Sequence, residues 1–242
     1  AFAVFDALIR KMPDNPELDN LFIEMCRKHN RKQNLETLYK VLSEQRKPEI
    51  REFLPYVSAE ILLMEGKKDE ALKLLAESDT SNRQLLFRAA YLLGENDRYK
   101  PAIRYYEKLE SIAPDFRPLA LINLSEIYKA EGKKKEALQS AANAWRLDPE
   151  SSNVKFCYAS RLLEDKEYEQ VVEVLKLPRY PGKVEERLLK LWEPAMNHVI
   201  ESSFSEKRYE KVLEYCRYLQ IYLPESPVAR QYIDKVNELQ KK

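Results

Sequence analysis

Glycine is scarce in this chain, with only 4 residues among 242. Nucleotide-binding α/β folds and β-sandwiches use glycine in phosphate loops and tight turns, so its scarcity argues against both classes. Long apolar runs are also missing, because no window approaches the roughly 18 consecutive apolar residues of a membrane-spanning helix. Lysine, glutamate, leucine and alanine dominate instead, a composition typical of long helices.

Cysteine and net charge are low as well. Cys26, Cys157 and Cys216 are far apart and follow no CxxC spacing, so no disulfide framework is expected. This pattern leans toward a reducing compartment and favours the cytoplasm over the periplasm, although periplasmic proteins without disulfides are common. The net charge of +1, from 41 basic and 40 acidic side chains, argues against duplex nucleic acid or an anionic membrane as the dominant partner.

The chain does contain a repeat. The hexapeptides GKKDEA (66–71) and GKKKEA (132–137) differ at one position. An apolar residue that follows such turns recurs at intervals of 31, 35 and 34 residues, at Ala71, Ala102, Ala137 and Val171. Self-similarity at this period is typical of stacked helical hairpins.

Residues 118–151 form the clearest unit. An apolar stripe at spacings of three, four and seven residues predicts its first helix, at Leu121, Leu124, Ser125 and Tyr128. After the turn EGKK, a stripe of small residues predicts the second helix, at Ala137, Ala141 and Ala144. Pro149 ends the unit because proline cannot continue a helix.

This unit resembles a tetratricopeptide repeat, a helix–turn–helix of about 34 residues. The residues just named and Pro149 fill the family's positions 4, 7, 8, 11, 20, 24, 27 and 32. Leu121 replaces the usual tryptophan and Ala141 the usual aromatic residue. The pattern is degenerate, so pentatricopeptide and half-a-TPR repeats stay open as related alternatives.

The resemblance covers nearly the whole chain. It implies an all-α, right-handed α-solenoid superhelix of about six helix–turn–helix units with a C-terminal capping helix. We predict a single repeat domain over 1–242. Its parts are the second helix of a truncated repeat (1–18), repeats over 19–51, 52–82, 83–117, 118–151 and 152–182, an irregular repeat (183–225) and the capping helix (226–242).

Both ends of the regular array depart from the pattern. Residues 1–12 fit only the second half of a repeat, which suggests a fragment of a longer chain or, alternatively, a cap. The segment KLPRYPGKV (176–184) contains two prolines and a glycine, which rule out helix. A longer helix should follow from about Val184 to Ser205, and Pro194 should kink or split it.

In tetratricopeptide stacks the first helix of each hairpin lines the concave surface, so the resemblance implies a partner-binding face there. The residues predicted to bind a partner are Tyr56, Glu60, Gln84, Phe87, Tyr91, Ile122, Asn123, Glu126, Phe156 and Ser160. Position 5 carries a large apolar side chain in four successive repeats, and we call these residues the inner row: Tyr56, Phe87, Ile122 and Phe156. Such a row suits an extended peptide or an amphipathic helix. The alternative is that these side chains pack on one another or under the terminal helix.

Some members of the family bind the C-terminal carboxylate of a partner through a clamp of lysine, asparagine and arginine on this face. Here Asn123 keeps one clamp position, while Phe87 and Tyr91 occupy two others. Asn153 and Cys157 replace the basic residues of the following repeat. The comparison with the family therefore argues against binding of a C-terminal tail.

No catalytic or cofactor motif occurs, such as GxSxG, HExxH, GxGxxG or a phosphate loop. Cys26 and His29 lie three residues apart on one helix face, but a closed zinc site needs four ligands and no second pair follows. Both occupy positions that are core in the family. His198 has no recognisable nucleophile near it. We expect no metal, no cofactor and no enzymatic activity.

The sequence thus predicts a non-enzymatic protein–protein interaction scaffold that binds a peptide or helix in its concave groove, as part of a longer chain or a multiprotein complex. One alternative is a structural segment of a bacterial envelope assembly, secretion or polysaccharide-export protein. A minor alternative is RNA binding, suggested by Arg104-Tyr105-Tyr106 and Arg217-Tyr218. The near-zero net charge provides no field to support it.

Overall fold

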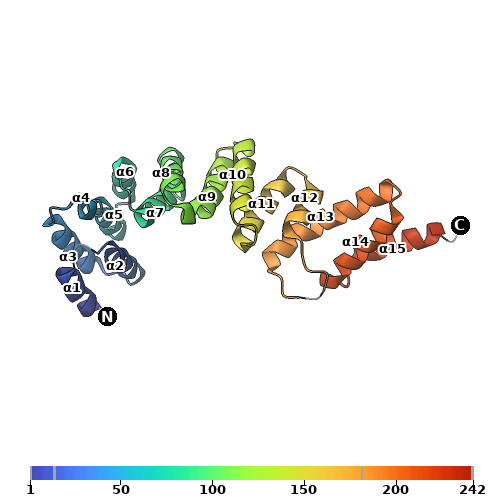
Figure 1. The fold of residues 1–242 in the computed structure, drawn as a ribbon, viewed down its shortest axis with the longest axis horizontal. Helices are drawn as coiled ribbons and strands as arrows, with labels where there is room; N and C mark the ends of the chain where they lie inside the picture. The colour runs from blue at the N-terminus through green and yellow to red at the C-terminus, as the bar shows by residue number, and fades with distance from the viewer. Residues whose placement is uncertain (1, 13–14, 181, 241–242) are drawn as a thin grey trace. The chain divides into compact units, whose positions relative to one another are not determined.

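The computed structural model describes residues 2–12, 15–180 and 182–240, and all regular elements in these ranges are helical (Figure 1). The described residues form two compact units, unit 1 up to Ile127 and unit 2 from Tyr128 onward. The sequence predicts one domain over the whole chain. Because this depends on how the two units combine, it stays a prediction. None of the helices in the described ranges is long and apolar enough to cross a membrane.

Unit 1 is built from consecutive helical hairpins. Its elements are α1 (Phe2–Lys11), α2 (Pro16–Lys28), α3 (Lys32–Ser43), the single turn α4 (Pro48–Arg51), α5 (Leu54–Met64), α6 (Lys68–Glu77), α7 (Arg83–Gly94), α8 (Tyr99–Ile112), the 3₁₀ turn η1 (Pro114–Phe116) and most of α9 (Arg117–Ala130). Helices α2 and α3, α5 and α6, and α7 and α8 pack as pairs. The pairs are joined in turn by contacts of α3 with α5 and of α6 with α7, while α1 packs on α2 and α3.

Unit 2 continues the same construction. Its helices are α10 (Lys134–Leu147), α11 (Ser152–Glu164), α12 (Tyr168–Leu175), α13 (Glu186–Ser205), α14 (Tyr209–Tyr222) and α15 (Pro227–Gln240). Each helix packs on the next, and α13 also packs on α11. Helix α15 contacts both α14 and α13. The prediction of a terminal helix that covers the last hairpin is therefore confirmed.

Two repeat positions form the core of every hairpin. Position 8, on the first helix, is exposed by 1% or less at Cys26, Ala59, Ala90, Ser125 and Ala159. Position 20, on the second helix, is exposed by 1% or less at Leu38, Ala71, Ala102, Ala137, Val171 and Val212. These side chains are mostly small, so the two helices of a hairpin can approach closely. The burial that the repeat pattern predicted at these two positions is confirmed.

The turn inside each hairpin uses a left-handed residue. Positive φ values between 51° and 77° occur at Asn30, Gly66, Asp97, Gly132, Lys166 and Lys207. At each turn the next N–H bonds back to a carbonyl of the first helix, as from Lys67 to Leu62 at 2.9 Å. This pattern is a Schellman C-cap, which satisfies carbonyls that the helix end would leave unpaired. The glycines of the two matching hexapeptides occupy two of these left-handed positions.

Replacing Gly66 with alanine should lower the free energy of unfolding by about 1 kcal/mol. A Cβ at Gly66 would meet no atom within 4 Å, so the cost arises from the φ of +77° alone. The reverse change, Lys166→Gly, should stabilise the protein by about 0.5–1 kcal/mol because it relieves a side chain at φ +63°. Urea denaturation followed by far-UV circular dichroism measures both. Equal stability of Gly66→Ala and the unchanged protein would contradict this account.

Repeat 52–82 lacks the proline that closes the neighbouring repeats, and the carboxylate of Glu52 holds its final loop instead. Glu52 accepts hydrogen bonds from Thr80 Oγ1 at 2.7 Å and from the Ser81 N–H at 3.0 Å. Thr80 is 2% exposed. The loop between α6 and α7 is thus held by side-chain hydrogen bonds to the start of its own repeat.

The proline-rich segment between α12 and α13 forms no helix, as predicted, although Pro181 lies outside the described residues. Hydroxyls of α14 hold it in place: Tyr218 donates to the Leu177 carbonyl, and Tyr222 donates to that of Pro178 at 2.6 Å. The predicted long helix is observed as α13, and Pro194 does not split it. Pro194 is exposed, so water can reach the carbonyl that its missing N–H leaves unpaired.

Candidate functional site

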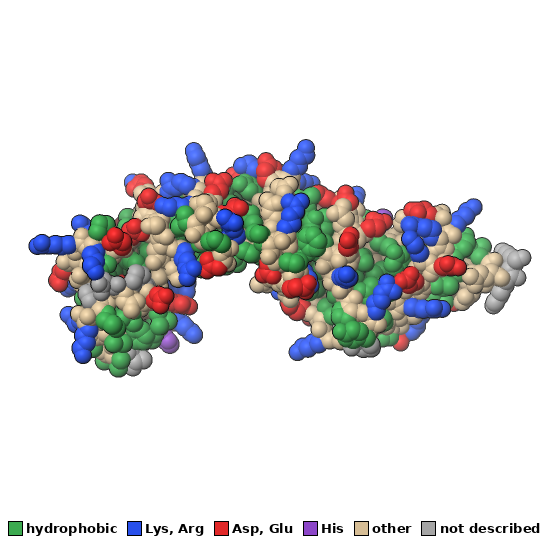
Figure 2. All heavy atoms as spheres, viewed as in Figure 1, with side chains coloured by type: hydrophobic (Ala, Val, Ile, Leu, Met, Phe, Trp, Pro, Cys, Tyr) green, Lys and Arg blue, Asp and Glu red, His purple; other side chains and the backbone are tan. Residues whose placement is uncertain are grey.

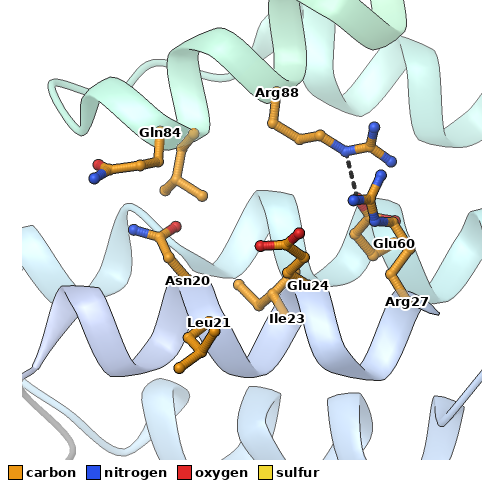
Figure 3. Close-up of a pocket in the computed structure, with 9 residues that line it drawn as sticks. Asn20, Leu21, Ile23, Glu24, Arg27, Glu60, Gln84 and Arg88 are labelled. Carbon is orange, nitrogen blue, oxygen red and sulfur yellow. Dashed lines mark hydrogen bonds and ion pairs between the residues drawn. The ribbon is translucent and has the colours of Figure 1, made fainter. Parts of the chain in front are cut away.

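The first helices of three successive hairpins of unit 1 surround a cavity. Helices α2, α5 and α7 line a space of about 280 Å³, with α5 between the other two (Figure 3). The lining residues are Asn20, Leu21, Ile23, Glu24 and Arg27 of α2, Glu60 of α5, and Gln84, Leu85 and Arg88 of α7. Apolar and polar side chains therefore share its surface.

An ion pair between two hairpins lies in the lining of the cavity. Arg88 Nε donates to Glu60 Oε1 at 3.0 Å, shown as the dashed line in Figure 3. The Glu60 side chain is 6% exposed and that of Arg88 is 27% exposed. Breaking an ion pair this shielded from water costs more free energy than breaking an exposed pair, because the remaining charge is poorly solvated. Glu60 thus forms a wall of the site and keeps α5 and α7 in register.

Other polar groups in the cavity have no partner among the described residues. The Asn20 Nδ2 atom is buried without a hydrogen bond. Asn20 on α2 and Gln84 on α7 lie at the same end of the site in this view, and the Glu24 carboxylate points into the space between these helices (Figure 3). Among the residues drawn there, only Glu60 and Arg88 are joined by an interaction. A buried donor without an acceptor costs about 1–3 kcal/mol, so an acceptor on a ligand would stabilise this arrangement.

Two members of the inner row, Tyr56 and Phe87, pack against other side chains of unit 1. Tyr56 is 3% exposed, and burial together with the nearby Tyr105 hydroxyl raises the pKa of its phenol. Phe87 is half-buried, and its ring centroid lies 6.1 Å from that of Tyr106 and 6.0 Å from that of Phe116. Tyr56 and Phe87 therefore contribute to contacts between hairpins.

The remaining members of the inner row are half-buried. Ile122 lies on α9 in unit 1. In unit 2, Phe156 packs against buried hydrophobic residues of that unit, and the Arg187 guanidinium covers its ring at 5.2 Å from the centroid. Arg187 is held there by a 2.8 Å hydrogen bond to Asn153. These contacts agree with the alternative that the row packs internally.

The other predicted site residues differ in the exposure and contacts of their side chains. Tyr91 is 40% exposed and stacks on Phe87 at 6.5 Å. Asn123 donates to the Leu119 carbonyl at 2.8 Å, and Ser160 donates to the Phe156 carbonyl at 2.7 Å. Both polar groups thus bond to their own helix. Glu126 is exposed on α9. Of the predicted set, the cavity brings together only Glu60 and Gln84.

The residues of α2 are the part of the cavity that the sequence analysis missed. With Cys26 at repeat position 8, Asn20 falls at position 2 and Arg27 at position 9, where stacks of this kind face inward. The register of repeat 19–51, which matches the repeat pattern only weakly, could therefore have predicted these residues. The predicted site residues all came from the stronger repeats, on α5, α7, α9 and α11.

Cys26 and Cys216 are buried in the core, and the two histidines are exposed. Cys26 is fully buried, whereas His29, also expected in the core, is exposed at the C-cap of α2 with its ring 5.8 Å from that of Phe2. His198 stacks on Tyr168 at 3.9 Å. Burial raises the pKa of the Cys216 thiol to about 11. Within the described ranges, no three potential metal ligands of the His, Cys, Asp or Glu type lie together.

Charged side chains are interspersed on the face of the molecule shown in Figure 2. Lysine and arginine alternate with aspartate and glutamate over both units, and many are joined as ion pairs, such as Arg83 with Asp115 at 2.8 Å. Nucleic-acid surfaces instead gather basic side chains on one face. The visible face offers no such gathering.

Comparison with known proteins identifies the fold. No family model matches the chain, and no curated protein sequence does. The chain is similar to the solved C-terminal part of a TPR repeat-containing protein from Cytophaga hutchinsonii, with a TM-score of 0.55 and 15% identity over 96% of this chain and 92% of that one. It is also similar to PilF of Pseudomonas aeruginosa, with a TM-score of 0.50 and 16% identity over 90% and 97%. The chain therefore has a TPR-like helical-repeat fold, as predicted.

Proposed function

We propose that the chain is a non-enzymatic protein-interaction scaffold, and that unit 1 binds a peptide of a partner protein in the cavity between α2, α5 and α7. Helical-repeat folds present extended surfaces to partners and have no need of a reactive centre. The observation that supports this site is the convergence of three first helices on one cavity, where the Asn20 Nδ2 atom is buried without a hydrogen bond.

The size and lining of the cavity fit a short peptide stretch. About 280 Å³ lies just below the range for pockets that hold drug-sized ligands, roughly 300–1,000 Å³. Leu21, Ile23 and Leu85 supply apolar surface, and the carboxamides supply hydrogen bonds that fix orientation. A large planar cofactor would need more enclosed apolar volume than this site offers.

A selection from a randomised peptide library displayed on phage tests the proposal. The full chain is immobilised, and the selected peptides are synthesised and titrated by fluorescence anisotropy. Replacing Gln84 with alanine should weaken binding about tenfold or more, since it removes hydrogen bonds in a shielded site. The thermal midpoint should stay unchanged because the Gln84 side chain has no hydrogen bond to the residues that the structure describes.

Gln33→Ala is the matched control, since Gln33 is an exposed glutamine on α3 in the same unit. It should leave the affinity unchanged. If the selected peptides bind Gln84→Ala and the unchanged chain equally well, the cavity is not the binding site. If the selection enriches no peptide, unit 1 is not a peptide receptor.

A further inference from the structure

This inference rests on the proposed function and specifies the chemistry of the peptide. We propose that the cavity takes an extended peptide of the partner carrying one basic and one acidic side chain two residues apart. The basic side chain pairs with Glu24, and the acidic one pairs with Arg27.

The backbone of the peptide is extended because of the carboxamides. Each carboxamide carries one donor and one acceptor group, the same pair that a peptide unit carries. Asn20 on α2 and Gln84 on α7 carry these groups, and both residues line the cavity (Figure 3). An extended chain has free N–H and C=O groups to meet them, whereas an α-helix has already paired its own.

The packing of the inner row also argues against a helix as the ligand. An amphipathic helix binds through a stripe of apolar anchors that enter a hydrophobic groove. Tyr56 is 3% exposed, and Phe87 is surrounded by other rings of unit 1. The apolar surface that such a helix would need is therefore largely used inside the unit.

The charges of α2 set the side-chain preference. Glu24 and Arg27 are exposed, line the cavity and form no ion pair with the residues drawn in Figure 3. Glu60 and Arg88 balance each other through their ion pair. The charges left to meet a ligand are thus one negative and one positive, and a peptide with a complementary pair matches both.

The spacing follows from helix and strand geometry. Side chains three residues apart on a helix have Cβ atoms about 5–6 Å apart. Side chains two residues apart on an extended chain point to the same side and are separated by about 6.6–6.8 Å. Glu24 and Arg27 therefore face alternate residues of an extended peptide. A helical ligand would instead place its charges three or four residues apart.

Deep sequencing of the same peptide library after selection tests this inference. The selection is run on the unchanged chain, on Glu24→Gln and on Arg27→Gln. The unchanged chain should enrich opposite charges at a spacing of two residues. Glu24→Gln should lose the basic preference only, and Arg27→Gln the acidic preference only. Each variant should bind the peptide selected on the unchanged chain roughly three- to tenfold more weakly than the unchanged chain does.

Glu17→Gln and Lys28→Gln are the controls, because both residues are exposed on α2 and lie outside the cavity. They should leave the enriched pattern intact. Charges enriched at a spacing of three or four residues would overturn the extended peptide. Peptides that depend on Gln84 but show no charge pair would overturn this inference while the proposed function stands. Peptides that do not depend on Gln84 would overturn both.

Discussion

Replacing Trp192 with alanine should lower the free energy of unfolding by about 4 kcal/mol, the largest stability loss we expect from one side chain in unit 2. Trp192 is 0% exposed, and its ring meets Tyr218 edge-on at 5.0 Å and Tyr222 at 5.7 Å. Those two tyrosines hold the proline-rich segment through their hydroxyls. The substitution therefore removes a large core side chain and loosens the support of that segment.

Trp192→Phe is the informative control. Within the described residues, the indole Nε1 has no hydrogen-bond partner, so phenylalanine loses volume but no hydrogen bond. We expect a cost of about 1–2 kcal/mol for it. Urea denaturation measures both variants, with fluorescence of Trp145 as the remaining reporter in unit 2. Equal costs for the two variants would show that ring volume is not what stabilises this core.

Thiol labelling shows where the loss occurs. Cys216 lies in unit 2 and Cys26 in unit 1, and both are 0% exposed. In repeat proteins each hairpin depends mainly on its neighbours, so Trp192→Ala should speed the alkylation of Cys216 far more than that of Cys26. Mass spectrometry of the labelled peptides gives both rates. Equal acceleration at the two cysteines would mean that the units unfold together.

Replacing Tyr56 with alanine should lower the free energy of unfolding by about 3 kcal/mol. The reason is that Tyr56, on α5, is only 3% exposed and its hydroxyl lies near that of Tyr105 on α8. Tyr39→Ala is the matched control in the same unit, because Tyr39 is 39% exposed and should cost about 0.5 kcal/mol or less. Urea denaturation followed by circular dichroism measures both. If Tyr56→Ala is as mild as Tyr39→Ala, Tyr56 is a surface residue and returns to the candidates for partner contact.

The hairpins could be predicted from the sequence because their determinants are local. Small residues at positions 8 and 20, such as Ala90 and Ala102, mark where two helices of one hairpin touch. Proline closes several hairpins, and glycine supplies the left-handed turn at Gly66 and Gly132. These signals depend on neighbours within about 34 residues, so a single sequence contains them in full.

Features that depend on particular side-chain contacts, rather than on the repeat positions, could not be predicted in the same way. The burial of Phe87 depends on Phe116, which reaches it from the 3₁₀ turn after the following helix. The closure of repeat 52–82 depends on Glu52, a residue 28 positions before Thr80. Lys166 and Lys207 take left-handed conformations that lysine does not favour, because the hairpin geometry requires them. Repeat periodicity alone does not encode such distant pairings.

Only part of the candidate site could be predicted from the sequence, for the same reason. Glu60 and Gln84 come from repeats whose register is clear, and both line the cavity. Asn20, Glu24 and Arg27 come from a repeat whose register is weak, and only the structure shows that they face the same space. The ion pair between Glu60 and Arg88 joins residues of two hairpins, which spacing within one repeat does not reveal.

Two-dimensional NMR of the isotopically labelled chain, titrated with the strongest selected peptide, tests peptide binding in this cavity most directly. The account predicts that the largest shifts occur at the side-chain amides of Asn20 and Gln84 and at the Nε–H groups of Arg27 and Arg88. Backbone shifts should be concentrated on α2, α5 and α7. Shifts confined to unit 2, or centred on Tyr91 and Ile122 with none at Asn20 and Gln84, would contradict it.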